Sequence, residues 1–383
     1  MIYLLKRHLT YLKNIESKKL VVFVIGTRPE AIKMAPLIIA FKSNKDIRIK
    51  VIFTGQHKEM VVQVLKLFNI KSDFDLNLMK INQSLTYINC KVLEELERIF
   101  SEIKPNLVLV QGDTTTSFAG GLAAFYQKIP VGHIEAGLRS DDFYDPYPEE
   151  LNRRLISQIS EIHFAPTTRA KENLIKDGIT KNIFITGNTA IDALLLISKN
   201  IKPPQKIDIN WSKNKVILLT VHRRENRGEK LIDITKGITK ILEMNNDALF
   251  IIPMHRNQEI RKILKSQLGS NRRVLLTEPL DYDEMIFLMK KCMLILTDSG
   301  GLQEEAPSFG KPVLVLRDTT ERQESIEAGT SLLIGSDSDK IATIANDLLN
   351  NHKRYEKMSE INNPYGDGKA SMKILDICTN WLK

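Results

Sequence analysis

The 383-residue chain contains few cysteines and no long apolar segment, and each absence excludes a class of protein. Cys90, Cys292 and Cys378 are far apart and have no CxxC spacing, so we predict neither a disulfide framework nor a metal site. No run approaches the ~20 apolar residues that span a bilayer, and the basic first residues are not followed by a cleavage-like pattern. We therefore expect a cytoplasmic protein with no membrane partner.

Aromatic residues are also scarce, at 7% of the chain, and they are not interleaved with basic side chains in a recognition pattern. The formal net charge is +9, but lysine and arginine are scattered along the sequence, so we expect no nucleic-acid partner. An anionic small molecule accounts for basic site residues equally well. Hydrophobic residues, by contrast, make up 43% of the chain, which is enough to build two domain cores.

Short β-branched runs alternate with helical patterns along the chain, which predicts an α/β fold with two doubly wound, Rossmann-like domains. The predicted domains are 20–198 and 215–362, joined by a polar, proline-containing linker at 199–214. An extension at 1–19, expected to be helical, precedes them, and a helix at 363–383 follows. The expected strands lie at 20–25, 49–54, 107–110, 130–134, 162–165, 182–186, 215–221, 248–253, 274–277, 293–297 and 312–316.

The stretch VIGTRPEAIKMAPLI places two cations, Arg28 and Lys33, in the opening turns of a predicted helix. Gly26 supplies the tight turn after a strand, Pro29 suits the first helical turn, and Glu30 suits the positive end of the helix dipole. A cation there is disfavoured by roughly 0.3–1 kcal/mol unless an anion lies between it and the free backbone N–H groups. The pattern indicates a phosphate site, although solvent exposure or pairing with carboxylates would also satisfy both cations.

The second half of the chain contains a comparable pattern in LTDSGGLQEEAPSFGKPVLVL. Ser299, Gly300 and Gly301 leave backbone N–H groups accessible where a helix begins, which suits an anion. Glu304 and Glu305 are expected in the first turn of that helix. There they would either complement the dipole or accept hydrogen bonds from a ribose diol.

Ligands of doubly wound sheets bind beyond the carboxyl ends of the strands, and this sequence is unusually polar at those positions. His222, in HRREN, follows the first strand of the second domain. It suits donation to a phosphate, although a loop histidine satisfied by its neighbours would explain it too.

The first domain supplies three carboxylates near strand ends. Asp113 follows the strand LVLV and precedes a helix, so it is either a site residue or the N-cap of that helix. Glu135 directly follows the strand PVGHI and has no helix to cap, which favours a functional role. Glu149 lies in a first helical turn with Arg153 at i+4, so it is either a site residue or half of a surface ion pair. Carboxylates in such positions suit general acid and base chemistry.

Several motifs together resemble one family: GTRPEAIKMAP, GDTTTSFAGGLAAFYQKIPVGHIEAGLRS, PEELNRRL, TGNTAIDAL, HRREN, LTDSGGLQEEAPSFGKPVLVLRDTTER and NPYGDG. From near residue 20 to its C-terminus the chain is similar to the non-hydrolysing UDP-N-acetylglucosamine 2-epimerases. The resemblance implies a glycosyltransferase-B type fold, with two Rossmann-like domains around a central cleft and a last helix that crosses back to the first domain. It also implies a homodimer that needs no metal or nicotinamide cofactor and binds UDP-N-acetylglucosamine and UDP.

The implied reaction interconverts UDP-N-acetylglucosamine and UDP-N-acetylmannosamine, which supplies N-acetylmannosamine units for surface polysaccharides. UDP leaves C1 as H2 is removed, a 2-acetamidoglucal intermediate forms, and UDP adds back with the proton delivered to the opposite face. Cations would stabilise negative charge on the diphosphate, while carboxylates act as acid and base on two faces.

By motif position, the resemblance implies these ligands of the diphosphate and ribose: Arg28, His222, Ser299, Gly300, Gly301 and Glu305. It implies these catalytic residues: Asp113, Glu135, Glu149, Lys33, Arg153 and His222. The three carboxylates would be the acid and base, and Lys33 and Arg153 would position groups or stabilise charge. Which carboxylate serves which face of the sugar stays open.

Some bacterial relatives bind a second UDP-N-acetylglucosamine beside the substrate as an activator, and Gln56, His57 and Gln83 occupy motif positions that could contribute. Asn82 stands where certain activated members have arginine. Three alternative functions remain at this point: a hydrolysing epimerase that releases UDP and N-acetylmannosamine, a retaining glycosyltransferase, and a non-catalytic UDP-sugar sensor. The motif GTRPEAIKM argues against the first. The acidic residues of HIEAG and PEELNRR argue against the second, and the presence of Asp113 and Glu135 argues against the third.

Overall fold

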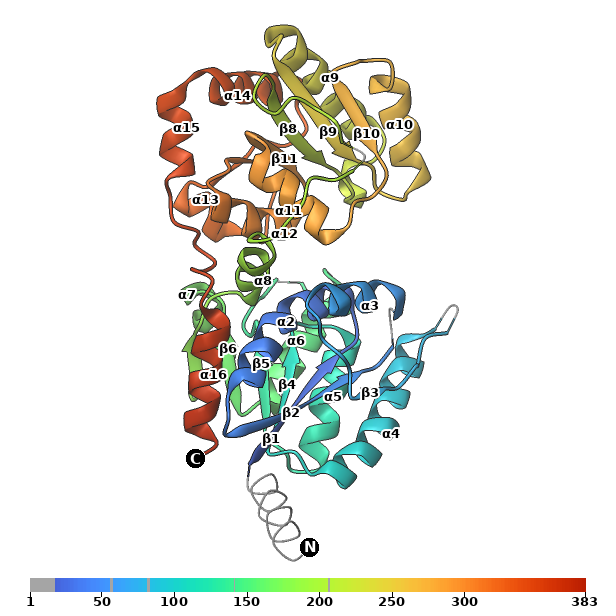
Figure 1. Cartoon of the computed structure of the whole chain (residues 1–383), viewed down its shortest axis with the longest axis vertical. Helices are drawn as coiled ribbons and strands as arrows, with labels where there is room; N and C mark the ends of the chain where they lie inside the picture. Colours follow the sequence, from blue (N-terminus) through green and yellow to red (C-terminus); the bar gives the residue numbers. More distant parts are fainter. Residues whose placement is uncertain (1–17, 56–57, 81–82, 141, 206) are drawn as a thin grey trace, which may run out of the picture. The chain divides into compact units, whose positions relative to one another are not determined.

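The computed structural model describes residues 18–55, 58–80, 83–140, 142–205 and 207–383 (Figure 1). The chain divides into two compact units. The first unit runs to Ala193 and also contains Gly368–Lys383, and the second unit is Leu194–Asp367. The predicted N-terminal extension lies outside the described residues up to residue 17.

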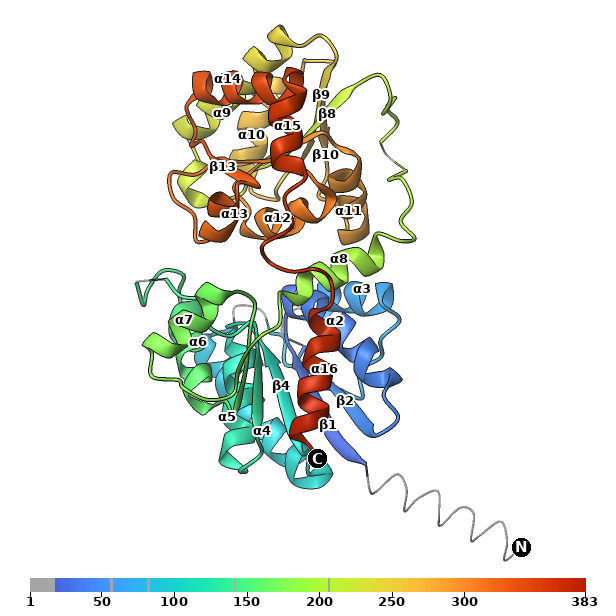
Figure 2. The same cartoon turned by 90° about the vertical axis from the view of Figure 1, so that its left-hand side faces the viewer.

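The first unit is built on a seven-stranded parallel sheet in the order β3-β2-β1-β4-β5-β6-β7. Its strands are β1 (Lys19–Ile25), β2 (Ile47–Phe53), β3 (Phe74–Asp75), β4 (Leu107–Gln111), β5 (Val131–Ile134), β6 (Ile162–Ala165) and β7 (Ile183–Ile185). Its helices are α2 (Arg28–Ser43), α3 (Lys58–Leu67), α4 (Leu85–Ile103), α5 (Thr115–Tyr126), α6 (Glu149–Ile159), α7 (Thr168–Lys176), the first part of α8 (Thr189–Ile197) and α16 (Ala370–Trp381). The C-terminal helix α16 packs against α2, so both ends of this unit's sequence contribute to one body (Figure 2).

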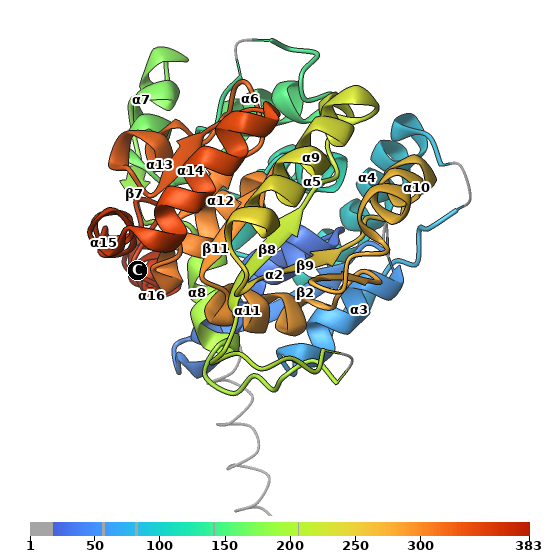
Figure 3. The same cartoon turned by 90° about the horizontal axis from the view of Figure 1, so that it is seen from above.

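The second unit is built on a six-stranded parallel sheet in the order β10-β9-β8-β11-β12-β13. Its strands are β8 (Lys215–Thr220), β9 (Ala248–Pro253), β10 (Val274–Thr277), β11 (Leu294–Thr297), β12 (Val313–Val315) and β13 (Ser331–Leu333). Its helices are α9 (Glu229–Met244), α10 (Gln258–Leu268), α11 (Tyr282–Lys291), α12 (Gly300–Glu305), α13 (Gln323–Ala328), α14 (Ser338–Asn350) and α15 (His352–Ser359), with 3₁₀ turns η1 (Arg224–Asn226) and η2 (Ala306–Phe309). Helices α9 and α14 pack side by side (Figure 3).

The predicted α/β fold with two parallel, doubly wound sheets is confirmed. Each strand expected from the sequence is present within two residues of its expected bounds. Strands β3 and β13 were not predicted, because strands of two and three residues at the sheet edges carry no periodic pattern. None of the helices in the described ranges is long and apolar enough to cross a bilayer.

The central strands of the first unit hold the turns that follow them. The apolar side chains of β1 from Val21 to Ile25 and those of β4 from Leu107 to Val110 are buried, as parallel strands covered on both faces require. Burial of each such side chain contributes about 1.5–3 kcal/mol, which makes the carboxyl ends of these strands a rigid platform. Gly26 is required there, because a Cβ at this position would lie 2.3 Å from the Oγ1 of Thr116 at the start of α5.

Candidate active site

Glu135 lies in the turn after β5, with its side chain only 6% exposed. Its backbone φ of 65° is a left-handed conformation that costs a non-glycine residue free energy and that clusters at functional sites. Oε1 accepts hydrogen bonds from Lys33 Nζ at 2.5 Å and from Asn188 Nδ2 at 3.1 Å. Oε2 accepts a hydrogen bond from Gln111 Nε2. The cation and the two amides therefore surround the carboxylate of a predicted catalytic residue with donors.

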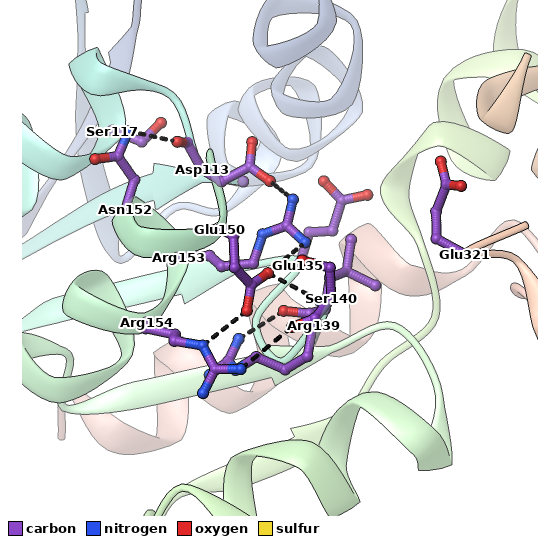
Figure 4. A network of polar contacts seen from close by, with 12 residues as sticks. Asp113, Ser117, Glu135, Arg139, Ser140, Glu150, Asn152, Arg153, Arg154 and Glu321 are labelled. Carbon is purple, nitrogen blue, oxygen red and sulfur yellow. Dashed lines mark hydrogen bonds and ion pairs between the residues drawn. The ribbon is translucent and has the colours of Figure 1, made fainter. Parts of the chain in front are cut away.

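Asp113 lies in the turn after β4, the strand next to β5, and binds Arg153 (Figure 4). Arg153 Nη2 donates to Asp113 Oδ2, and Arg153 Nη1 donates to Glu150 Oε2 at 3.2 Å. The N-cap alternative for Asp113 is wrong. Thr114 caps α5 instead, because its Oγ1 accepts the N–H of Ser117 at 3.1 Å. The structure thus brings together the predicted site residues Asp113 and Arg153.

The alternative that Glu149 forms a surface ion pair with Arg153 is also wrong, because the guanidinium of Arg153 pairs with Asp113 and Glu150. Glu149 is the first residue of α6 and is half-buried. Glu150 is fully buried and accepts a hydrogen bond from Arg154 Nε at 2.7 Å. Glu150 was not predicted as a site residue, since the two adjacent glutamates can be distinguished only when the face that α6 buries is known.

Arg28 is the first residue of α2, is half-buried, and makes no hydrogen bond or ion pair with the described part of the chain. Glu30 holds the turn that carries it. Glu30 Oε2 accepts the N–H groups of Gly26 and Thr27 at 2.7 and 2.6 Å, and Oε1 accepts the hydroxyl of Ser117 at 2.6 Å. Burial raises the pKa of Glu30, although these hydrogen bonds oppose the shift. This carboxyl therefore ties the start of α2 to the start of α5, a role beyond complementing the dipole.

Asp298 lies after β11 in the second unit and organises the turn after the neighbouring strand β8. Its Oδ1 contacts His222 Nδ1 at 2.9 Å, and its Oδ2 accepts the N–H of Arg223 at 2.9 Å and Asn226 Nδ2 at 3.0 Å. Burial raises the pKa of Asp298, but the hydrogen bond and charge of His222, together with the backbone hydrogen bonds from His222 and Arg223, lower it overall. With Nδ1 engaged, His222 keeps Nε2 for a ligand. The sequence analysis missed this partner.

His255 is a second histidine near this turn. The ring centroids of His222 and His255 are 6.0 Å apart. Burial lowers the pKa of His255, and the charge of His222 adds to that shift, which favours a neutral His255 imidazole.

The turn after β11 continues through Ser299, Gly300 and Gly301 into α12. Ser299 is the N-cap of α12, but its side chain makes no capping hydrogen bond. A Cβ at Gly300 would lie 3.2 Å from Glu321 Oε1, so glycine suits this packed position. The structure places these residues beside the His222 turn, since β11 and β8 are neighbours.

Glu304 and Glu305 do not lie in a first helical turn, which corrects the expectation from the sequence. Helix α12 ends at Glu305 after six residues, so both side chains lie at its C-terminal end. Glu304 is buried and pairs with Arg322 Nε at 2.6 Å. Glu305 accepts a hydrogen bond from the hydroxyl of Tyr282 at 3.2 Å.

The predicted second-ligand residues Gln56 and His57 lie outside the described residues. Gln83 is half-buried, and its Oε1 accepts the N–H of Lys80 at 3.1 Å. Within the described ranges, no group of three or more His, Cys, Asp or Glu side chains is placed to hold a metal ion.

The family model described as UDP-N-acetylglucosamine 2-epimerase matches residues 39–379. A UDP-N-acetylglucosamine 2-epimerase of Bacillus subtilis is 50% identical over 361 residues, which are 94% of this chain and 95% of the relative. The crystal structure of UDP-GlcNAc 2-epimerase from Neisseria meningitidis bound to UDP-GlcNAc is 48% identical, with a TM-score of 0.86 over 94% of this chain and 100% of that one. The Methanocaldococcus jannaschii UDP-GlcNAc 2-epimerase in complex with UDP-GlcNAc and UDP is 37% identical, with a TM-score of 0.75 over 94% and 99%.

Two Rossmann-like sheets with charged residues in their strand-end turns define an α/β protein of the nucleotide-binding class. This chain belongs to the UDP-N-acetylglucosamine 2-epimerase family, a family of isomerases. The resemblance found in the sequence motifs is thereby confirmed.

Proposed function

We propose that this chain interconverts UDP-N-acetylglucosamine and UDP-N-acetylmannosamine by reversible elimination of UDP. A base removes the proton at C2, the C1–O bond to UDP breaks, and the electron pair of the C–H bond becomes the C1–C2 double bond of 2-acetamidoglucal. UDP then adds back to C1 while an acid delivers a proton to the other face of C2. The observation that carries the proposal is the pair of strand-end carboxylates, Glu135 and Asp113, each bound to a cation.

The first unit would supply the proton chemistry. Asp113, Glu135 and Glu149 are proposed as the acid and base candidates, because elimination and re-addition on opposite faces need more than one such group. Lys33 and Arg153 would hold two of these carboxylates in place and stabilise negative charge during the reaction. Arg28, whose guanidinium has no partner in the described part of the chain, is proposed to bind the diphosphate.

The second unit would bind the nucleotide. His222 is proposed to bind the diphosphate through Nε2, since Asp298 engages Nδ1. Ser299, Gly300 and Gly301 would add hydroxyl and backbone N–H donors from the adjacent turn. Glu305 is proposed to accept from the ribose hydroxyls, with Tyr282 fixing the carboxylate.

The function is tested by incubating UDP-N-acetylglucosamine with the protein in D2O and following the sugar by proton NMR. We expect deuterium at C2 and a mixture of the two epimers with UDP still attached. Stoichiometric release of free N-acetylmannosamine would support the hydrolysing alternative instead. No exchange at C2 would support the UDP-sugar sensor. The comparisons favour neither alternative.

A homodimer, a cytoplasmic location and a supply of N-acetylmannosamine units to surface polysaccharides accompany this proposal. They follow from the family resemblance and from the cysteine pattern. Light scattering of the purified protein tests the dimer: a mass near 87 kDa is expected, about twice the 43.7 kDa chain. A mass of one chain would contradict it.

A further inference from the structure

The motif TGNTAIDAL has no assigned role in the reaction, yet it delivers a side chain to Glu135, one of the proposed acid and base groups. Resting on the proposed function, we propose that Asn188 and Gln111 are positioning residues that hold the Glu135 carboxylate ionised and in one orientation. Neither residue would touch the reacting atoms. Their effect on the reaction would pass through Glu135.

The amide of Asn188 can be oriented in only one way. Asn188 lies directly before α8 and is 3% exposed. Its Oδ1 accepts the N–H of Ala190 at 2.9 Å, as a residue at the start of a helix commonly does. The Nδ2 group must then point the other way, and it donates to Glu135 Oε1 at 3.1 Å. The helix start therefore fixes which end of the amide faces the carboxylate.

Gln111 supports the other carboxylate oxygen. It is the last residue of β4, is 2% exposed, and donates from Nε2 to Glu135 Oε2. Its backbone carbonyl accepts the hydroxyl of Ser117 at 2.6 Å, which fixes the strand end. Donors from α2, from β4 and from the turn before α8 thus reach both oxygens of one side chain.

This arrangement favours the charged carboxylate. Hydrogen bonds donated to an ionised carboxylate stabilise that form, and a neutral acid would have to turn one oxygen into a donor facing another donor. The left-handed backbone of Glu135, with φ 65°, is consistent with a residue that its surroundings hold in place. A base kept ionised and fixed is ready to remove a proton without reorganising.

Several described charged and titratable groups around Glu135 bear on a pH experiment. Lys33 on α2 pairs with it directly, and Asp113 in the neighbouring strand-end turn is paired with Arg153. His133, two residues earlier on β5, donates from Nε2 to the carbonyl oxygen of Gly112 at 2.7 Å. Burial lowers the pKa of His133 to about 3, so its imidazole stays neutral in ordinary assay buffers.

The substitution Asn188→Asp separates positioning from folding. A carboxylate caps a helix as an amide does, so α8 should keep its cap, and any fall in Tm should be limited to the repulsion between the two carboxylates. The donor to Glu135 Oε1 is lost, however, and a second negative charge takes its place. Like charges at this distance make protonation easier, so the acid limb of kcat for C2 exchange should move up by about one pH unit or more. At an acidic pH where the rate still rises with pH, a shift of one unit lowers the rate of C2 exchange by about tenfold. The affinity for UDP should not change.

Gln111→Met provides a second variant that introduces no charge. Methionine has a similar length but cannot donate, so we expect a lower kcat for C2 exchange, by about tenfold, and an unchanged KM. This variant still tests the inference if the Asn188→Asp protein does not fold.

Asn351→Asp is the matched control. Asn351 also begins a helix, α15, where its Oδ1 accepts the N–H of Arg354 at 3.1 Å and its Nδ2 donates to Asp347 Oδ1 at 3.2 Å. The same exchange of amide for carboxylate there should leave the pH profile unchanged. A wild-type pH profile in folded Asn188→Asp, or wild-type kcat in Gln111→Met, would overturn the inference. Wild-type protein that does not exchange C2 at all would instead overturn the proposed function.

Discussion

Carboxylates follow the central strands of both units, but the two units surround them differently. In the first unit, Glu135 and Asp113 are bound by the side-chain cations of Lys33 and Arg153, and Asp113 stays 23% exposed. In the second unit, Asp298 is fully buried and binds backbone N–H groups as well as His222. Side-chain partners can rearrange when substrate binds, whereas backbone partners fix a loop. The first arrangement suits a reagent and the second suits a scaffold for a binding site.

The substitution Glu135→Gln tests this difference between the two units with the largest expected effect. If Glu135 is a reagent, the amide should lower the rate of C2 deuterium exchange by about 10²–10⁴-fold, because it cannot accept a proton, while UDP affinity stays within about twofold. Exchange is measured by NMR and affinity by calorimetry. Asp73→Asn is the control, since Asp73 also pairs with a lysine, Lys50 at 2.8 Å, but outside the strand-end turns of β4 and β5. Wild-type exchange in Glu135→Gln would remove that residue from the mechanism.

Asp298→Asn tests the scaffold side. The amide can still accept from one backbone N–H group, but it loses the negative charge beside His222 Nδ1. We expect UDP affinity to fall by about tenfold, in line with the loss of one charge-assisted hydrogen bond. At saturating substrate the exchange rate should fall less than in Glu135→Gln. An unchanged dissociation constant for UDP would show that Asp298 does not prepare the binding site.

Opposite pKa shifts in the two units give a prediction for stability against pH. The pKa of Glu30 is raised by burial, so its contribution to stability is present at low pH and is lost as the pH rises through the folded-state pKa. The pKa of Asp298 is lowered, so its contribution is present at neutral pH and is lost as the pH falls.

As the pH rises from about 3 to 7, the Tm of Glu30→Gln relative to wild type should therefore increase, while that of Asp298→Asn should decrease. Each unit of pKa shift corresponds to about 1.4 kcal/mol of stability. Differential scanning fluorimetry across this pH range measures the Tm of each variant and of wild type. If the Tm differences of both variants from wild type changed in the same direction with pH, the opposite pKa shifts of the two carboxyl groups would be contradicted.

The smallest expected effect concerns the residue proposed to bind ribose. Tyr282→Phe removes the hydroxyl that donates to Glu305 and should weaken UDP binding by about two- to tenfold, equivalent to one ordinary hydrogen bond. Tyr355→Phe is the control, because it also removes a hydroxyl donor in the second unit, to Met293 O at 2.9 Å. Equal dissociation constants in the two variants would argue against Glu305 as the ribose ligand.

Much of the fold was predictable from the sequence because its signals are local. Runs such as LVVFVI and LVLV are wholly apolar and short, which is typical of strands buried on both faces. The turns after them contain the charged residues that the site uses, so Asp113, Glu135 and His222 could be selected as candidates from strand positions alone.

The partners of these residues could not be found in the same way. Glu135 meets Lys33 and Asn188, which are 102 and 53 positions away, and Asp298 meets His222 across 76 positions. Such pairs depend on which strands are neighbours, and a single sequence does not state the strand order. A single sequence also does not state which face of a helix is buried. For this reason Glu150 could not be distinguished from Glu149.

The central claim is that UDP detaches from the sugar and rejoins it, and positional isotope exchange tests this most directly. UDP-N-acetylglucosamine would be labelled with ¹⁸O in the oxygen that joins C1 to the β-phosphorus. Because the β-phosphate of a detached UDP can rotate before re-addition, we predict that the label spreads to the non-bridging β-phosphate oxygens alongside deuterium entry at C2. Epimerisation with the label retained in the bridge would contradict the elimination mechanism.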